Sequence, residues 1–304
     1  MKTVYLGTSE FAATVLHILA GSEHRPTLVV SQPDRPQGRG RKPRPPPVAA
    51  AARELKIELL QPEDVNSIET VAAIEAHSPD VLCMCAYGQL IKEPILDKFG
   101  LLNVHPSLLP RWRGAAPIER AIMAGDAETG VSIMRVVAAL DAGDICLQAR
   151  TRIEPTETGG ALAKRLARLG GESMVDALAA QQRSELEFRP QGEDGTTYAE
   201  KIAASDRRLD LNAPAVEVAR VARALSPHIG TYLESDAGER IKVLVAKARD
   251  GTARPGSVLL EEGQLLVGCG EGLLQLIELQ PAGKRPMPAE AYLAGHTVPR
   301  TLAV

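Results

Sequence analysis

Two polar residues, Asn103 and His105, follow an apolar run and are of types that suit chemistry at a carbonyl group. They are two positions apart, so in an extended strand their side chains project to the same side. Asn103 offers a neutral amide donor, and His105 offers a donor whose protonation changes near pH 7. Together they could stabilise an oxyanion that develops during acyl transfer.

A third polar residue, Asp141, lies in a turn-like stretch that contains Gly143, where a glycine permits a close turn. A carboxylate brought near His105 would favour the imidazolium form and fix the ring's orientation. The residue types alone leave structural roles open. Asn103 would also serve as a turn residue, His105 as a hydrogen-bonded histidine at a sheet edge, and Asp141 as an Asx-turn residue.

The first half of the chain alternates short β-rich runs with helical patterns, which predicts a doubly wound, mostly parallel α/β sheet of the Rossmann-like kind. In such sheets ligands bind beyond the carboxyl ends of the strands. The predicted strands are 3–6, 28–30, 57–60, 81–85 and 101–104, and the predicted helices are the segment after Ser9, 48–55, 65–76 and 93–98.

The second half begins with a helix after Pro117, two β-rich runs at 130–137 and 145–151, and a long helix at 158–182. A break at 189–194 suggests a linker. Beyond a helix at 215–225, short strands at 231–234, 241–246, 257–260, 264–267 and 273–279 predict a small antiparallel β-barrel of the OB-like kind. We therefore expect a catalytic domain at 1–188, a linker at 189–208 and a C-terminal barrel at 209–304.

Composition and simple motifs exclude several classes of function. No apolar run approaches the roughly 20 residues of a membrane span, and the N-terminal residues do not have the pattern of a signal peptide, so we expect a cytoplasmic protein. The stretch after the first strand, Gly7 to Phe11, lacks the glycine-rich forms of nicotinamide and ATP sites, and favours a tight turn with Ser9 as a helix N-cap. The four cysteines form no Cys-x-x-Cys pair, and we expect neither a disulfide nor a metal.

A basic stretch, 33–47, contrasts with the net charge of −3 of the whole chain. Its cations are Arg35, Arg39, Arg41, Lys42 and Arg44. A local cluster of this kind suits a polyanion, although a solvated, proline-rich surface loop is the alternative.

The motif Asn103-x-His105-Pro-Ser107-Leu108-Leu109-Pro110, followed by Leu140-Asp141-x-Gly143-Asp144, resembles that of formyltransferases that use 10-formyltetrahydrofolate. Over essentially the whole chain, further stretches resemble the methionyl-tRNA formyltransferase family. They include Gln32–Pro36, Ala86-Tyr87-Gly88, Arg111–Ile118, Tyr198–Ile202 and Gln280–Lys284. Pro106 and Ser226-Pro227-His228 depart from that family's pattern.

The resemblance implies roles for individual residues. Asn103, His105 and Asp141 would be catalytic. The folate-binding residues would be Ser107, Leu108, Leu109, Pro110, Tyr87 and Gly88, and Arg39 would face the acceptor end of tRNA. The pattern of basic residues adds Arg35, Arg41, Lys42 and Lys201 as expected tRNA-binding residues. The implied substrates are 10-formyltetrahydrofolate, as formyl donor, and initiator methionyl-tRNA, and we expect a monomer that needs no metal.

Three alternatives remain at this stage. A sugar-nucleotide formyltransferase shares the catalytic trio, and a purine-pathway formyltransferase fits the His-Pro-Ser-Leu-Leu-Pro stretch but leaves about the last hundred residues without a purpose. An inactive nucleic-acid-binding module with the same fold would have no use for all three catalytic residues. The basic stretch, together with the group Lys201, Arg207 and Arg208, favours tRNA over the other acceptors.

Overall fold

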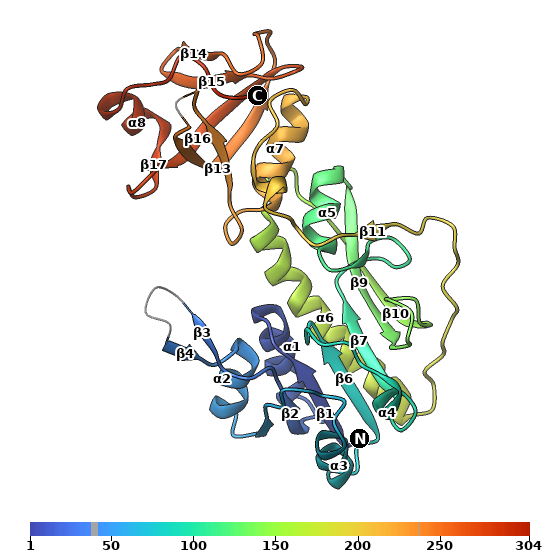
Figure 1. The fold of residues 1–304 in the computed structure, drawn as a ribbon. Coiled ribbons are helices and arrows are strands. Elements are labelled where there is room, and N and C mark those ends of the chain that lie inside the picture. The colour runs from blue at the N-terminus through green and yellow to red at the C-terminus, as the bar shows by residue number, and fades with distance from the viewer. Residues whose placement is uncertain (38–41, 237) are drawn as a thin grey trace. The chain divides into compact units, whose positions relative to one another are not determined.

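The computed structural model describes residues 1–37, 42–236 and 238–304, apart from the side chains of Gln37 and Lys42. The chain divides into two compact units (Figure 1). The first unit comprises Met1–Gly114, Glu128–Arg152 and Ala163–Tyr198, and the second comprises Ala115–Ala127, Ile153–Leu162 and Ala199–Val304.

A seven-stranded sheet forms the centre of the first unit, in the order β10-β9-β7-β6-β1-β2-β5. The strands β5, β2, β1, β6 and β7 are parallel to one another. Strand β9 is antiparallel to both of its neighbours, β7 and β10. This order confirms the predicted doubly wound sheet, with its switch point between β1 and β6. The bounds are β1 (Thr3–Gly7), β2 (Pro26–Val30), β5 (Glu58–Leu60), β6 (Val81–Cys85), β7 (Leu101–His105), β9 (Glu128–Arg135) and β10 (Ile145–Arg152).

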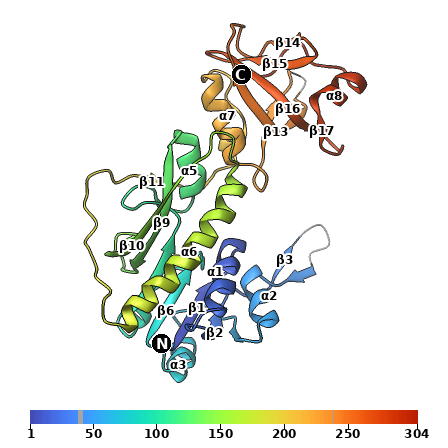
Figure 2. The same ribbon diagram turned by 180° about the vertical axis from the view of Figure 1, so that it is seen from behind.

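Helices cover both faces of this sheet (Figure 2). Side chains of α3 (Ile68–Ala76) and α4 (Glu93–Leu96) join one apolar cluster with β1, β2 and β6. On the other face lie α1 (Glu10–Ala20) and α6 (Gly159–Gln182), and α2 (Pro47–Glu54) packs against α1. Ser9 is the N-cap of α1, as predicted. A Cβ atom on Gly170 of α6 would lie 2.6 Å from Val104, so glycine is what lets this helix approach β7 so closely.

Two short strand pairs were not predicted. The basic stretch forms an antiparallel hairpin of β3 (Arg35–Gln37) and β4 (Lys42–Arg44), and β8 (Arg113–Gly114) pairs with β11 (Tyr198–Ala199). The β3–β4 hairpin leaves the carboxyl end of β2, the same edge of the sheet at which β7 ends in His105 (Figure 1). A basic ribbon therefore extends from the edge that holds the candidate catalytic residues.

The second unit contains an antiparallel sheet in the order β12-β13-β16-β15-β14, with β17 paired to β16. The C-terminal residues bridge its two outer strands: Leu302 pairs beside β12 at Ser235, and Thr301 pairs beside β14 at Ser257. This closure confirms the predicted barrel. The elements of the second unit are α5 (Pro117–Ala124), the 3₁₀ turn η1 (Ser205–Arg207), α7 (Ala215–Ala224), β12 (Thr231–Glu234), β13 (Arg240–Arg249), β14 (Val258–Glu261), β15 (Gln264–Gly268), β16 (Leu273–Pro281), β17 (Met287–Pro288) and α8 (Ala289–Gly295).

The apolar core of the barrel includes Val218 and Ala222 of α7 together with inward-facing residues of the strands. Among the described residues, no helix is both long and apolar enough to cross a membrane.

Candidate active site

Asn103 and His105 lie in β7, beside β6 on one edge and β9 on the other. Both side chains are buried, with 7% and 4% of their surfaces exposed. Because side chains alternate along a strand, the two face the same side of the sheet. No hydrogen bond to the Asn103 amide is found within the described part of the chain, which leaves its donors and acceptor for a ligand.

Each ring nitrogen of His105 faces a different acceptor. Nε2 lies 2.9 Å from the backbone oxygen of Trp112, and Nδ1 lies 3.6 Å from Oδ2 of Asp141. A carbonyl oxygen can only accept a hydrogen bond, so Nε2 carries a proton. The Asp141 carboxylate faces the other ring nitrogen, so the imidazole is held in a fixed orientation between two acceptors.

The turn that bears Asp141 holds the carboxylate in place. The backbone N–H of Gly114 donates to Oδ2 at 2.9 Å, and no bond to Oδ1 is found in the described residues. Asp141 itself has φ of +46°, a left-handed conformation that is costly for a residue other than glycine. A Cβ atom on Gly143 would lie 2.0 Å from the oxygen of Arg135, so only glycine fits the second half of this turn.

The structure therefore brings His105 and Asp141 together, although they are far apart in the sequence, and places Asn103 on the same face of β7 as His105. The site thus combines an amide, an imidazole and a carboxylate at the carboxyl edge of a parallel sheet. These groups are suited to stabilising an oxyanion and to moving a proton. No group of three or more His, Cys, Asp or Glu residues that could hold a metal occurs in the described ranges.

The segment after β7, which sequence reasoning assigned to the folate, is anchored mainly by its own backbone. Ser107 is fully buried, and its hydroxyl donates to the oxygen of Arg111 at 2.6 Å. Ser132 of β9 donates to the Ser107 oxygen at 2.7 Å and accepts from the Leu109 N–H at 3.1 Å. Leu108 packs over Gly130, where a Cβ atom would lie 2.6 Å from its side chain.

Leu109 is buried beside Met134 and Ile145, and Gln148 donates to its carbonyl at 3.0 Å. A cis peptide bond links Leu109 to the half-buried Pro110. The contacts of Leu109 therefore anchor a loop at the edge of the site.

Tyr87 and Gly88 follow β6 at the same edge of the sheet. Tyr87 is buried, its hydroxyl has no partner in the described residues, and burial raises its pKa above the usual value. Its carbonyl accepts from the Thr8 hydroxyl at 2.6 Å, which ties the loop to the turn after β1. Gly88 is exposed and has φ of +91°, so the backbone is open to a ligand there.

The basic hairpin contains four of the residues expected to bind tRNA. Arg35 is exposed and forms an ion pair with Glu63 at 2.6 Å. The structure pairs Arg35 with Arg44 across the hairpin, and this places two cations side by side. Arg39 and Arg41 lie outside the described residues, and so does the side chain of Lys42.

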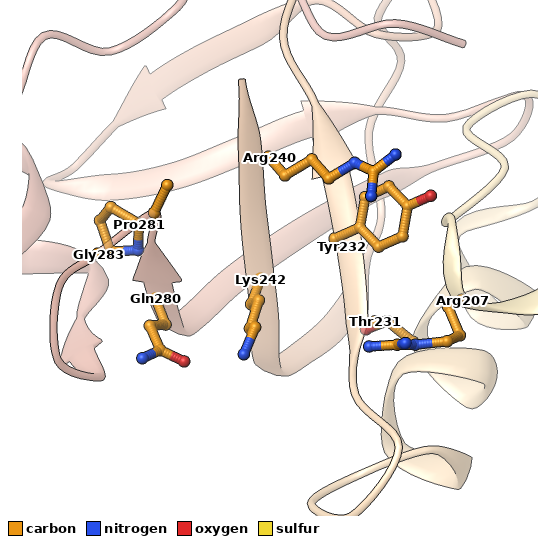
Figure 3. Close-up of a pocket in the computed structure, with 9 residues that line it drawn as sticks. Arg207, Thr231, Tyr232, Arg240, Lys242, Gln280, Pro281 and Gly283 are labelled. Carbon is orange, nitrogen blue, oxygen red and sulfur yellow. The ribbon is translucent and has the colours of Figure 1, made fainter. Parts of the chain in front are cut away.

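In the second unit, Lys201 is exposed. The sequence singled out Arg207 as a basic residue, but it did not indicate the basic pocket on the barrel that Arg207 shares with other cations. Arg207, Arg240 and Lys242 line this pocket with Tyr232 and Gln280 (Figure 3). We call it the barrel pocket. It encloses about 250 Å³.

The cations of the barrel pocket differ in their contacts. The Arg240 guanidinium stacks on the Tyr232 ring at 4.6 Å and lies 3.7 Å from Glu234, while Arg207 donates to the Gly230 oxygen at 3.1 Å. Lys242 is exposed and has no ion-pair partner among the described residues. The alternation of Arg240 and Lys242 along β13 was a signal in the sequence, because both lie on one face of that strand.

Comparison with known proteins identifies the class to which this fold and site belong. A family model described as formyl transferase matches residues 1–178, and one described as formyl transferase, C-terminal domain, matches residues 201–297. The chain belongs to the formyl transferase family.

Within that class, the chain is 45% identical over 302 residues to a methionyl-tRNA formyltransferase of Ruegeria pomeroyi, covering 99% of each chain. Solved structures that share the fold include a sugar formyl transferase and HypX. WlaRD, a sugar 3N-formyl transferase, is 15% identical with a TM-score of 0.66, over 94% of this chain and 99% of that one. HypX from Aquifex aeolicus, in complex with tetrahydrofolic acid, is 19% identical with a TM-score of 0.66, over 97% of this chain and 47% of that one.

Proposed function

We propose that this chain transfers the formyl group of 10-formyltetrahydrofolate to the amino group of initiator methionyl-tRNA, for translation initiation. One observation carries the proposal: His105 pairs with Asp141 at the carboxyl edge of the sheet, in a chain similar along its whole length to methionyl-tRNA formyltransferases.

Asn103, His105 and Asp141 are the catalytic residues in this proposal. The methionine amine attacks the formyl carbon, and the carbonyl oxygen becomes an oxyanion. This oxyanion accepts a hydrogen bond from the Asn103 amide, and the His105 ring, held by the Trp112 carbonyl and Asp141, adds electrostatic stabilisation. The amine loses its proton to Asp141, directly or through water, and Oδ1 is the oxygen that no described residue engages. The bond from the formyl carbon to the folate nitrogen then breaks, and that nitrogen receives a proton.

The loops at this edge provide the folate site. Tyr87, Gly88 and the segment Ser107–Pro110 surround the carboxyl ends of β6 and β7, where ligands of doubly wound sheets bind. Ser107 acts through the shape of the loop, because its hydroxyl is already engaged by Arg111. No metal takes part, since positioned donors and a free amine suffice for this transfer.

Basic groups in each unit provide contacts for tRNA. The hairpin cations Arg35, Arg39, Arg41 and Lys42, together with Lys201 and the barrel pocket, are suited to phosphate. We assign catalysis to residues 1–188, the connection to 189–208, whose first residues pack on the first unit, and tRNA contact to the barrel at 209–304. The protein works as a monomer in the cytoplasm, where its tRNA substrate is found.

A direct test compares three acceptors with labelled 10-formyltetrahydrofolate: methionyl-tRNA, an amino-sugar nucleotide and glycinamide ribonucleotide. Labelling of methionyl-tRNA alone is the expected result. Labelling of either small acceptor, with none of the tRNA, would refute the proposed substrate while leaving formyl transfer intact.

A further inference from the structure

The segment 189–197, which follows α6 of the first unit, lies directly against the turn that bears Asp141. Arg189 exchanges two backbone hydrogen bonds of 2.9 Å with Ile145, the first residue of β10. Thr197 accepts from the Arg113 N–H at 2.9 Å through its carbonyl oxygen, and from the Trp112 N–H at 2.9 Å through its hydroxyl. One end of the segment 189–197 is thus fixed at the start of β10, and the other end is fixed beside Trp112, whose carbonyl faces His105.

Between these two anchors, the side-chain amide of Gln191 makes four hydrogen bonds. Its oxygen accepts from Nε and Nη2 of Arg113, at 3.1 and 2.8 Å. Its nitrogen donates to the backbone oxygens of Asp141 and Gly143, at 2.8 and 2.7 Å. Because the arginine guanidinium only donates hydrogen bonds and a carbonyl oxygen only accepts them, the amide oxygen of Gln191 must face Arg113 and the amide nitrogen must face the two carbonyls.

These bonds connect both supports of the Asp141 carboxylate. On one side Gln191 holds the carbonyls of the turn, where Asp141 has its left-handed φ of +46°. On the other side it holds Arg113, and the next residue, Gly114, donates to Asp141 Oδ2. A single side chain therefore sets the position of the carboxylate relative to its hydrogen-bond donor and to His105.

We infer that Gln191 is a positioning residue for formyl transfer, which acts by holding Asp141 against His105. The inference rests on the proposed function, because the carboxylate that it positions is the proposed proton acceptor. Gln191 does not contact His105, so its loss changes the placement of Asp141 and not the chemical groups present. A small misplacement of a catalytic group is enough to cost up to about 100-fold in rate.

Two variants separate hydrogen bonding from packing. Gln191→Met keeps the length of the side chain and removes all four bonds. Gln191→Glu keeps acceptors for Arg113 but replaces the two donors with a charge that faces the carbonyls of Asp141 and Gly143. We expect both to lower kcat by about 10- to 100-fold with KM for each substrate within about twofold of the parent. The matched control is Gln182→Ala, an exposed glutamine at the end of α6.

The decisive measurement is a double-mutant cycle with Asp141→Asn. If Gln191 acts through the Asp141 carboxylate, Gln191→Met causes little further loss of kcat once that carboxylate is gone. Full additivity of the two losses would overturn the inference, because a general effect on folding is independent of Asp141. Parent-like kcat in both Gln191 variants would overturn it as well.

An activity-independent measurement distinguishes failure of this inference from failure of the proposed function. The imidazole ¹⁵N resonances of His105 report the carboxylate at Nδ1, and we expect Gln191→Met to move them while Gln182→Ala leaves them in place. Unmoved resonances would refute the positioning role even if methionyl-tRNA proved not to be the acceptor.

Discussion

Oδ2 of Asp141 lies 3.6 Å from Nδ1 of His105 and accepts from the Gly114 N–H, so one carboxylate oxygen faces the ring and the backbone together. Asp141→Asn keeps the shape of the side chain and its acceptor for Gly114 but removes the charge. We expect kcat to fall by about 100- to 1000-fold, because His105 loses the charge that orients its ring and the amine proton loses its acceptor. Steady-state kinetics with methionyl-tRNA check this.

Asp144→Asn is the matched control for that variant. Asp144 lies in the same turn, is half-buried and forms only a long ion pair of 3.9 Å with Arg135, so loss of its charge should leave kcat near that of the parent. Normal turnover in Asp141→Asn would reduce Asp141 to a turn residue.

Asn103→Ala tests the neutral donor of the site. The Asn103 amide makes no hydrogen bond within the described chain, so its removal leaves no protein partner unsatisfied. We expect a folded protein in which kcat falls by about 100- to 1000-fold, the usual cost of losing one oxyanion donor. Circular dichroism and thermal unfolding verify the fold, and unchanged turnover would remove Asn103 from the mechanism.

Much of the first unit's architecture could be predicted because its strands are short apolar runs that alternate with periodic helices. The carboxyl edge of such a sheet collects strand ends, which is why Asn103 and His105 could be placed at a site without coordinates. The approach of Asp141 to His105 was expected only because the motif resembles a known family.

Contacts between distant segments could not be predicted. Nothing near Gln191 in the sequence indicates that its amide meets the carbonyls of Asp141 and Gly143, because tertiary packing alone brings those segments together. The β3–β4 hairpin was missed because its prolines suggest a loop. In a ribbon of only two strands, Pro36 and Pro43 sit opposite each other without interrupting a larger sheet.

The buried histidine of the first unit makes stability depend on pH. His24 is fully buried, neither ring nitrogen has a partner in the described residues, and desolvation, with help from the N-terminal ammonium, lowers its pKa from the usual 6.5. The unfolded chain therefore binds more protons than the folded one between the lowered pKa and 6.5, and stability falls as the pH drops through that range.

His24→Leu should flatten this part of the acid dependence, since leucine has no proton to bind. Thermal unfolding midpoints between pH 7.5 and 5.0 provide the comparison, with His17→Gln as the control, because His17 is exposed on α1. An equal loss of stability toward acid in His24→Leu and the parent protein would assign the effect to other groups.

The barrel pocket provides the last prediction. Arg240 and Lys242 come from one face of β13, and Lys242 has no ion-pair partner in the described chain, so its charge is available to a phosphate (Figure 3). Each phosphate contact releases bound counterions and steepens the salt dependence of tRNA binding. We expect the double variant Arg240→Ala/Lys242→Ala to bind methionyl-tRNA at least about tenfold more weakly, and its plot of log affinity against log salt to be shallower by about 1 to 2 units. Affinity for the folate should not change.

Lys247→Ala is the matched control, because Lys247 is exposed on the same strand but does not line the pocket. If the double variant and Lys247→Ala show the same affinity and salt slope as the parent, the pocket does not meet tRNA, and the basic hairpin of the first unit becomes the main site of phosphate contact.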